Sequence, residues 1–170
     1  DWWEQSERRL RFRELLRDPT VSVPLEPTRI GNYGRRVGLV GASLVGRRVI
    51  ELLQPYDLTV AVYDPYLSAE EAARLGVEKV GDLDGLCASV DVLSLHAPDV
   101  EATRSMIGAD QLAALRDGAT FLNTARPALV DSAALEAELV SGRIAAVLDV
   151  AEPDPPPTGL ITNTTYATVP

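Results

Sequence analysis

The sequence is poor in cysteine and has no excess of basic residues. Cys87 is the only cysteine among 170 residues, so neither an intrachain disulfide nor a cysteine metal cluster is possible, and we expect no metal site. A reducing cytoplasm is the simplest location for such a chain. Sixteen basic residues stand against 25 acidic ones, a net charge of −9. Because binding to phosphates needs lysine and arginine in excess, we expect no nucleic-acid partner.

Long apolar runs are also missing. No run approaches the roughly 18 residues that cross a bilayer, and no segment is typical of a secretory signal, so the sequence predicts neither a membrane partner nor a signal peptide. The first residue is Asp, and we expect that the natural chain starts upstream. A hydrophobic share of 46% and this length fit one globular domain with a sizeable core.

Prolines and glycines divide the chain into three parts. Residues 2–17 mix charges with a partial apolar stripe, which predicts an exposed helix, and the three prolines and two glycines of residues 18–34 predict a linker. We therefore assign residues 1–34 to an N-terminal helix and connecting arm and residues 35–150 to the globular domain. Residues 151–170 are predicted to be a proline-rich exit segment, in which residues 164–169 form one more short strand.

Strands and helices alternate between these two ends. Strands are predicted at 37–40, 58–63, 77–80, 91–95, 119–123 and 144–149, with helices at 45–53, 68–75, 82–89, 111–115 and 132–140. Ser68 is the expected N-cap of the second helix, and Asp131 or Ser132 that of the last, which ends before Gly142. The apolar faces of the first and last helices are predicted to be Val45, Val49, Leu52 and Leu53, and Leu135, Leu139 and Val140. This alternation predicts an α/β, Rossmann-type doubly wound parallel sheet with helices on both faces.

The turn after the first strand, Gly41-Ala-Ser-Leu-Val-Gly46, is similar to the G-x-G-x-x-G pattern of dinucleotide-binding turns. In that pattern Gly41 permits the turn, residue 43 lets the backbone approach a pyrophosphate, and Gly46 allows close helix packing. Asp64 ends the second strand, where a carboxylate accepts both ribose hydroxyls and repels a 2′-phosphate. The constellation therefore predicts NAD rather than NADP as cofactor. An ordinary strand-to-helix turn is the alternative.

Ser43 occupies the position of the middle glycine. If the site demands a positive φ, a residue other than glycine costs about 1–2 kcal/mol, and its Cβ also crowds the phosphates. The hydroxyl can recover part of this loss by donating to a phosphate oxygen. We therefore expect weakened but retained binding, and we expect Ser43→Gly to tighten it.

Two longer segments, LSLHAPDVEATRSMIG and FLNTARPALVDSAALEAELVSGRIAAVLDVAEPDPPP, follow the turn. Together with it, over residues 34–157, they resemble the NAD-binding domain of the D-isomer-specific 2-hydroxyacid dehydrogenases. The resemblance implies an NAD-dependent oxidoreductase that transfers a hydride between the nicotinamide and C2 of a 2-oxo or 2-hydroxy acid of D configuration. Arg126, in a segment similar to N-x-A-R-G, would hold the substrate with its planar, permanently charged fork. The alternative for Arg126 is a surface arginine.

The resemblance also implies an acid-base pair. In the family a carboxylate raises the pKa of a catalytic histidine. By similarity to D-V-F-E-P-E-P, Asp154 stands for that carboxylate, with Glu152 as the alternative, and Asp149 holds the nicotinamide amide. The histidine itself would directly follow Pro170, since Val169-Pro170 resembles a T-P-H segment. The further cofactor contacts that the resemblance implies are the backbone N–H groups of Leu44 and Val45, the nucleotide neighbours His96, Pro98 and Thr103, and Thr124 and Ala125 on the nicotinamide side.

Three departures from the family pattern leave a second hypothesis open. Ser43 is one, and Asp154 is one methylene shorter than the usual Glu. Pro127 replaces a glycine, which confines Arg126 to extended conformations and removes a backbone donor. A degenerate NAD(H)-binding sensor or protein-interaction module would tolerate all three. A methyltransferase on a similar sheet is a third interpretation, but it leaves the Arg126 and Asp149 segments unexplained.

Family members carry a second domain that closes the cleft, and they pair their NAD-binding domains through a connecting segment. Residues 2–17 and the arm after them resemble that segment, which predicts a homodimer. Because the residues of the second domain are absent from this sequence, we expect the chain to be catalytically incomplete by itself.

Overall fold

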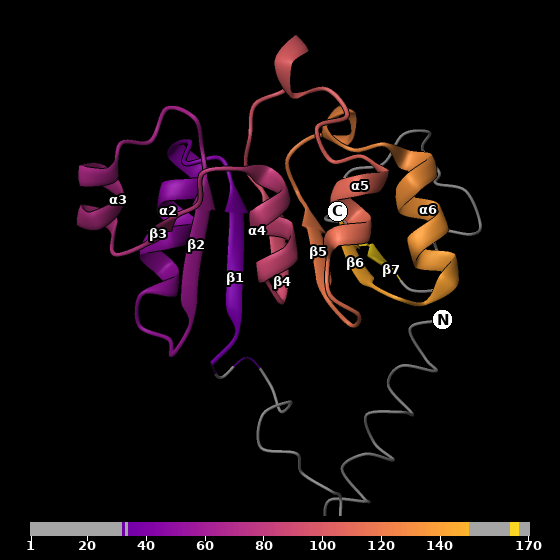
Figure 1. The fold of residues 1–170 in the computed structure, drawn as a ribbon, viewed down its shortest axis with the longest axis horizontal. Coiled ribbons are helices and arrows are strands. Elements are labelled where there is room, and N and C mark those ends of the chain that lie inside the picture. Colours follow the sequence, from indigo (N-terminus) through magenta and orange to yellow (C-terminus); the bar gives the residue numbers. More distant parts are fainter. Residues whose placement is uncertain (1–31, 33, 150–163, 167–170) are drawn as a thin grey trace, which may run out of the picture. The chain divides into compact units, whose positions relative to one another are not determined.

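The computed structural model describes residue 32, residues 34–149 and the strand at residues 164–166. These residues contain a seven-stranded parallel sheet (Figure 1), so the predicted α/β class and parallel sheet are confirmed. The order across the sheet is β3-β2-β1-β4-β5-β6-β7. The strands are β1 (Arg36–Val40), β2 (Thr59–Tyr63), β3 (Glu78–Lys79), β4 (Val92–Leu95), β5 (Thr120–Asn123), β6 (Ala145–Leu148) and β7 (Thr164–Tyr166).

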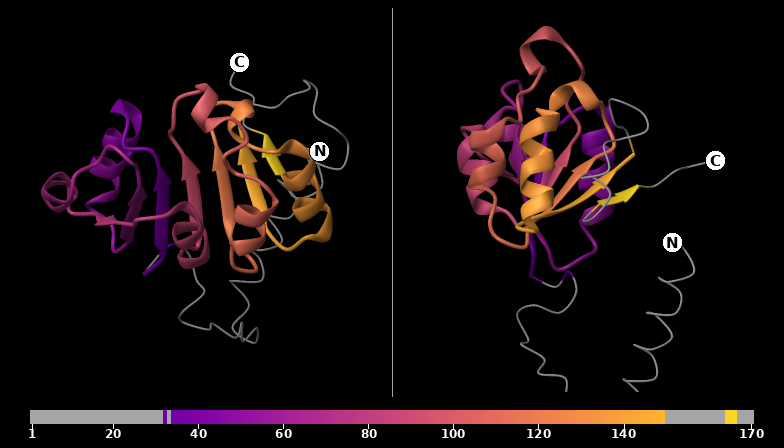
Figure 2. Two further views of the ribbon diagram at one scale, coloured as in Figure 1. Left: turned by 45° about the horizontal axis from the view of Figure 1, so that its top comes forward. Right: turned by 90° about the vertical axis from the view of Figure 1, so that its right-hand side faces the viewer.

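Helices cover both faces of this sheet, as Figure 2 shows in its right-hand view. One face packs against α4 (Leu83–Ser89), α5 (Ala109–Ala114) and α6 (Ser132–Ser141). The other packs against α2 (Leu44–Leu53) and α3 (Ala69–Leu75). Two apolar clusters result, one around Phe121, Leu86 and Leu139 and the other around Ile50 and Val62. Each fully buried side chain of this size contributes about 1.5–3 kcal/mol, so the two clusters hold the helices on the sheet.

Polar side chains cap most of the helices. Ser68 is the N-cap of α3, as predicted, and its Oγ accepts a hydrogen bond from the N–H of Glu71 at 3.1 Å. Asp131 is the N-cap of α6, because its Oδ1 accepts from the N–H groups of Ala133 and Ala134, so the choice between Asp131 and Ser132 falls to Asp131. Gly142 follows α6 with φ +74°, a left-handed conformation that glycine adopts readily.

The predicted apolar faces of two helices were partly wrong. Val45 and Leu52 of α2 are 63% and 54% exposed, because the inward side of this helix is centred on Gly46 and Ile50. Val49 and Leu53 are partly buried on that side. In α6, Leu135 and Leu139 are buried as predicted, whereas Val140 is 62% exposed. Each helical residue lies about 100° around the axis from its neighbour, so a residue beside a buried one can leave the core.

Other predicted elements are present with bounds shifted by one or two residues, and β7 confirms the short strand expected near residue 164. The predicted N-terminal helix and most of its arm, and most of the exit segment, lie outside the described residues. The division of the chain into three parts therefore stays a prediction. No helix in the described ranges is long and apolar enough to cross a membrane.

Three loops that contain predicted site residues follow the carboxyl ends of β1, β4 and β5. The chain order reverses between β1 and β4, which are neighbours although β2 and β3 separate them in sequence. Crossovers therefore leave β1 and β4 toward opposite faces, and the loops after the two strands part. Open parallel sheets bind ligands in the crevice at such a switch point.

Candidate functional site

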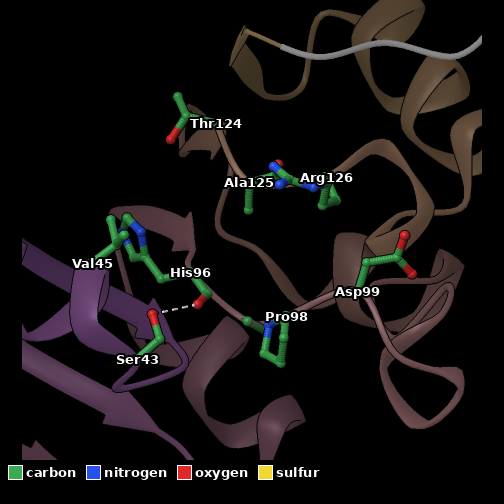
Figure 3. Close-up of a pocket in the computed structure, with 9 residues that line it drawn as sticks. Ser43, Val45, His96, Pro98, Asp99, Thr124, Ala125 and Arg126 are labelled. Atoms are coloured by element: carbon green, nitrogen blue, oxygen red, sulfur yellow. Dashed lines mark hydrogen bonds between the residues drawn. The ribbon is translucent and has the colours of Figure 1, made fainter.

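A cavity of about 400 Å³ opens at this switch point, between the loops that follow β1, β4 and β5 (Figure 3). Its wall is formed by Ser43, Val45, His96, Ala97, Pro98, Asp99, Thr124, Ala125 and Arg126. The structure thus brings together predicted cofactor and substrate residues from three separate segments of the sequence. Of the other predicted residues, Gly41, Leu44, Gly46, Asp64, Thr103 and Asp149 lie outside this wall, and Asp154 lies outside the described residues.

The two glycines of the turn permit close backbone approaches. Gly41 has φ +100°, and a Cβ at this position would lie 2.9 Å from the amide nitrogen of Ala97 at the end of β4. A Cβ on Gly46 would press against the carbonyl oxygen of Gly41, well inside van der Waals contact. The turn after β1, the start of α2 and the end of β4 therefore meet more closely than side chains would allow.

Ser43 has a different role from the one that the sequence suggested. Its φ is −63° and its ψ 178°, an extended conformation without strain, so the condition for the expected cost, a positive φ, is not met. The Oγ donates a hydrogen bond to the carbonyl oxygen of His96 at 2.8 Å and accepts one from the N–H of Gly46 at 3.3 Å. Its proton thus goes to the protein backbone rather than toward a phosphate. Ser43 caps α2 and ties the turn to the end of β4 (Figure 3).

The N-terminus of α2 offers a site for an anion. Leu44 and Val45 are the first two residues of this helix, whose N–H groups have no acceptor within the helix. The helix dipole adds partial positive charge at this end, and Val45 also lies in the cavity wall. A pyrophosphate fits these groups, because the adjacent glycine turn lets it approach the backbone.

Asp64 stands at the end of β2 beside the same turn. Its Oδ2 accepts a hydrogen bond from the N–H of Ala42 at 2.7 Å, and its Oδ1 accepts one from the N–H of Tyr66 at 2.8 Å. These bonds fix the carboxylate next to the glycine turn. Since each carboxylate oxygen can accept a second hydrogen bond, Asp64 keeps the capacity to bind the two hydroxyls of a ribose.

His96 is a buried residue of the cavity wall. Its side chain is 9% exposed, and its Nε2 lies 2.9 Å from the Oγ of Ser94. Burial lowers the pKa of His96, because the imidazolium form would lose its hydration. A buried imidazole that is bound to Ser94 agrees with the interpretation of His96 as part of the cofactor rim or of the structure.

Asn123 is a residue that the sequence analysis did not single out. It is the last residue of β5 and is 2% exposed, and its side chain binds the loop that follows. The Oδ1 accepts from the N–H of Ala125 at 3.1 Å, and the Nδ2 donates to the carbonyl oxygen of Arg126 at 3.0 Å. Its signal in the sequence was an amide side chain at the end of an apolar strand, directly before the arginine loop.

Arg126 is exposed at the mouth of the cavity. It has an extended backbone, with φ −148° and ψ 142°, which confirms the restriction expected from Pro127. Its Nη1 donates to the carbonyl oxygen of Ala125 at 2.6 Å, so the side chain lies back along its own loop (Figure 3). Among the described residues no carboxylate pairs with Arg126, so within that part of the chain its remaining donors can bind an anionic ligand.

Two more predicted residues, Thr103 and Asp149, form hydrogen bonds near the carboxyl ends of β4 and β5. The Thr103 hydroxyl donates to the carbonyl oxygen of Pro98 at 2.6 Å and so closes the loop after β4. The N–H of Asp149 donates to the carbonyl oxygen of Asn123 at 3.1 Å, which places Asp149 beside the end of β5.

Comparison with known proteins identifies the family. The model of the D-isomer specific 2-hydroxyacid dehydrogenase NAD-binding domain matches residues 7–170. The D-3-phosphoglycerate dehydrogenase of Methanocaldococcus jannaschii is 38% identical over 125 residues, which cover 73% of this chain and 24% of that protein. The hydroxypyruvate reductase of Thermotoga maritima is 40% identical over 124 residues, or 72% of this chain and 39% of the relative. The chain thus spans well under half the length of these relatives.

Solved structures lead to the same family. The apo form of Rhodotorula graminis D-mandelate dehydrogenase superposes with a TM-score of 0.74 and 29% identity, covering 81% of this chain and 41% of that one. D-lactate dehydrogenase with NAD+ from Lactobacillus jensenii gives a TM-score of 0.68 and 27% identity, over 78% of this chain and 44% of the other.

Proposed function

The chain belongs to the NAD-binding domains of the D-isomer-specific 2-hydroxyacid dehydrogenases, and on this premise we propose the activity of the whole protein. It transfers a hydride between NAD and C2 of a small 2-oxo or 2-hydroxy acid of D configuration. The observation that carries this proposal is the position of Arg126, an arginine without a carboxylate partner among the described residues, at the mouth of the cavity beside the glycine turn.

We assign the cofactor contacts from the family resemblance, which the geometry of the turn and the cavity supports for the pyrophosphate and the ribose. The N–H groups of Leu44 and Val45 bind the pyrophosphate, and Asp64 binds the adenosine ribose. Thr124 and Ala125 line the nicotinamide side, and Asp149 holds the carboxamide. NAD, when bound, supplies the hydride acceptor or donor for the reaction.

Arg126 acts on the acid substrate. Its guanidinium pairs with the substrate carboxylate and with the oxygen on C2, because a planar fork can bind two oxygens at once. Addition of a hydride to C2 leaves negative charge on that oxygen, and a fixed positive charge stabilises the transition state more than the ground state. Asp154 pairs with the histidine that supplies the proton, a role that rests on the family resemblance alone.

Kinetics of the full-length protein test this function. We expect NADH oxidation with at least one member of a panel of 2-oxo acids, and Arg126→Lys should lower kcat/KM by about a hundredfold or more. The control is Arg116→Lys, since Arg116 pairs with Asp91 at 3.6 Å at the amino end of the sheet. Binding of NADH without turnover of any 2-oxo acid would favour the sensor or interaction module instead.

The proposal also covers the oligomeric state of the protein and its location in the cell. We propose a homodimer in the cytoplasm, because residues 2–17 resemble the segment that pairs such domains and Cys87 is a single buried thiol. Light scattering tests the first part, and a monomeric mass for the full-length protein would contradict it.

A further inference from the structure

Arg47 directly follows the glycine turn, and its guanidinium forms an ion pair with another side chain. It lies in the first turns of α2, and its Nη1 is 2.6 Å from the Oε1 of Glu71 in the first turn of α3. The two side chains are only 37% and 29% exposed. The backbone of Glu71 is fixed as well, because its N–H binds the Ser68 cap. This ion pair therefore joins the two helices on one face of the sheet.

The pair lies close enough to Asp64 for the three charges to affect one another. The hydrogen bond that Arg47 donates to Glu71 is the largest cause that raises the pKa of Arg47, and the charges of Glu71 and Asp64 add to it. In turn, the hydrogen bond from Arg47 lowers the pKa of Glu71, while the charge of Asp64 opposes that change. The charge of Arg47 is thus affected by two carboxylates, its ion-pair partner Glu71 and the proposed ribose ligand Asp64.

Such an arginine would suit a cofactor that this chain is not expected to bind. NADP differs from NAD by a phosphate on the 2′ oxygen of the adenosine ribose, and NADP sites commonly hold that phosphate with an arginine near the end of the second strand. A guanidinium is well matched to phosphate geometry. Arg47 is near that place, but its Nη1 is bound to Glu71.

We propose that Glu71 is a specificity-determining residue. It holds Arg47 in an ion pair, so that the Arg47 guanidinium does not bind the 2′-phosphate of NADP. Asp64 repels the phosphate directly, and Glu71 removes the group that would otherwise compensate. The proposal rests on the proposed position of the adenosine ribose at Asp64. It assigns the exclusion of NADP to two carboxylates on different elements.

A neighbouring ion pair on α2 provides the matched control. Arg48 pairs with Glu51 on the same helix at 2.5 Å, and these side chains are 61% and 68% exposed. Neither residue is part of the cluster around Asp64. Glu51→Gln therefore releases an arginine of the same helix and changes the net charge equally, but it does so away from the ribose site.

Binding measurements on the full-length protein test the proposal without any turnover. We expect Glu71→Gln to tighten NADPH binding by tenfold or more in a fluorescence titration, with NADH binding changed less than threefold. Glu51→Gln should leave both affinities unchanged. Because partly exposed ion pairs contribute little to folding, Glu71→Gln should fold normally, and its retained NADH binding reports this.

A double variant isolates the part played by Arg47. In Glu71→Gln/Arg47→Gln the gain in NADPH affinity should disappear, since the freed guanidinium is its cause. A gain that persists in the double variant would overturn the proposal, as would unchanged NADPH affinity in Glu71→Gln with intact NADH binding. Failure of the unmodified protein to bind NADH would instead contradict the proposed cofactor site and remove the basis of this inference with it.

Discussion

The side chain of Asn123 binds the backbone of Arg126: its buried Nδ2 donates a hydrogen bond to the Arg126 carbonyl oxygen at 3.0 Å. Its Oδ1 accepts from the N–H of Ala125 at 3.1 Å, so both ends of one amide bind the same loop. The proposed substrate-binding arginine is thus placed by a residue that does not itself line the cavity. Asn123 is 2% exposed at the end of β5, so this buried side chain links the core to the loop that carries Arg126.

We expect Asn123→Ala to destabilise the fold and to misplace Arg126. The substitution leaves the Ala125 N–H without a partner, while the Arg126 carbonyl oxygen keeps only the longer hydrogen bond from the Leu129 N–H at 3.4 Å. One unpaired group costs about 1–3 kcal/mol, so the free energy of unfolding should fall by about that amount in urea. In the full-length protein, kcat/KM for the 2-oxo acid should fall more than NADH affinity does. Thr124→Ala, at the exposed next residue, should change stability by less than about 0.5 kcal/mol. Equal stabilities of the two variants would contradict the role of Asn123.

The difference between Asn123 and the glycines of the turn shows what the sequence could and could not provide. Gly41 and Gly46 were predictable, because their spacing between a strand and a helix specifies the backbone path. The partners of Asn123 are backbone groups of an irregular loop, and no periodic pattern encodes where such groups point. An amide at the end of a strand marks a polar position there, but its two hydrogen bonds become visible only in three dimensions.

Val45 and Val140 show a second limit. Both are apolar and lie next to buried positions, so periodicity placed them on the inner faces of α2 and α6. In the structure they are 63% and 62% exposed. A hydrophobic pattern cannot show which edge of the stripe reaches the sheet, because that depends on how the helix is rotated against its neighbours. For Val45 the exposed edge faces the cavity.

Ser43→Ala should cost more stability than the loss of a helix cap alone. The substitution removes the cap on the Gly46 N–H and the bond to the His96 carbonyl, so we expect about 1.5–2.5 kcal/mol in urea unfolding. Ser43→Gly should cost less than Ser43→Ala, because glycine is a better N-cap than alanine. With an unstrained φ of −63°, crowding of the phosphates is the remaining reason for Ser43→Gly to tighten NAD binding.

Ser68→Ala is the matched control for this prediction. Ser68 caps α3 through the Glu71 N–H at 3.1 Å, and no second hydrogen bond links its side chain to another element of the described chain. Its loss should cost about 1 kcal/mol. If Ser68→Ala destabilised the protein as much as Ser43→Ala does, the link from Ser43 to His96 would contribute nothing to stability.

Gly46→Ala should damage both folding and cofactor binding. The added Cβ would press on the Gly41 carbonyl oxygen, so α2 has to move away from the turn that carries the pyrophosphate site. Overpacking of this kind costs about 1–3 kcal/mol, and we expect a lower melting temperature and NADH binding weakened tenfold or more. Gly81→Ala provides the comparison, since a Cβ there meets nothing within 4 Å. A Gly46→Ala protein with normal NADH affinity would show that the close approach of α2 is unnecessary.

His96 should make the protein less stable as the pH falls below neutrality. It is the only histidine in the sequence, and burial lowers its pKa in the folded state below the ordinary value of 6.5. Well above pH 6.5 the imidazole is neutral in both the folded and the unfolded chain, and its contribution to stability is constant. As the pH falls through 6.5 toward the lower folded pKa, the unfolded chain binds the proton first, so the free energy of unfolding decreases.

Urea unfolding of the unmodified chain and of His96→Gln between pH 7.5 and 5.5 measures this contribution. In that window most carboxylates stay ionised, since their ordinary pKa values lie near 4. We expect the unmodified chain to lose stability with a slope of at most about 1.4 kcal/mol per pH unit, the limit for one proton. The curve for His96→Gln should be flatter, whatever the absolute cost of replacing the Ser94 partner. Parallel curves would mean that His96 is protonated as easily in the folded chain as in the unfolded one, and its burial in the cavity wall would then be incorrect.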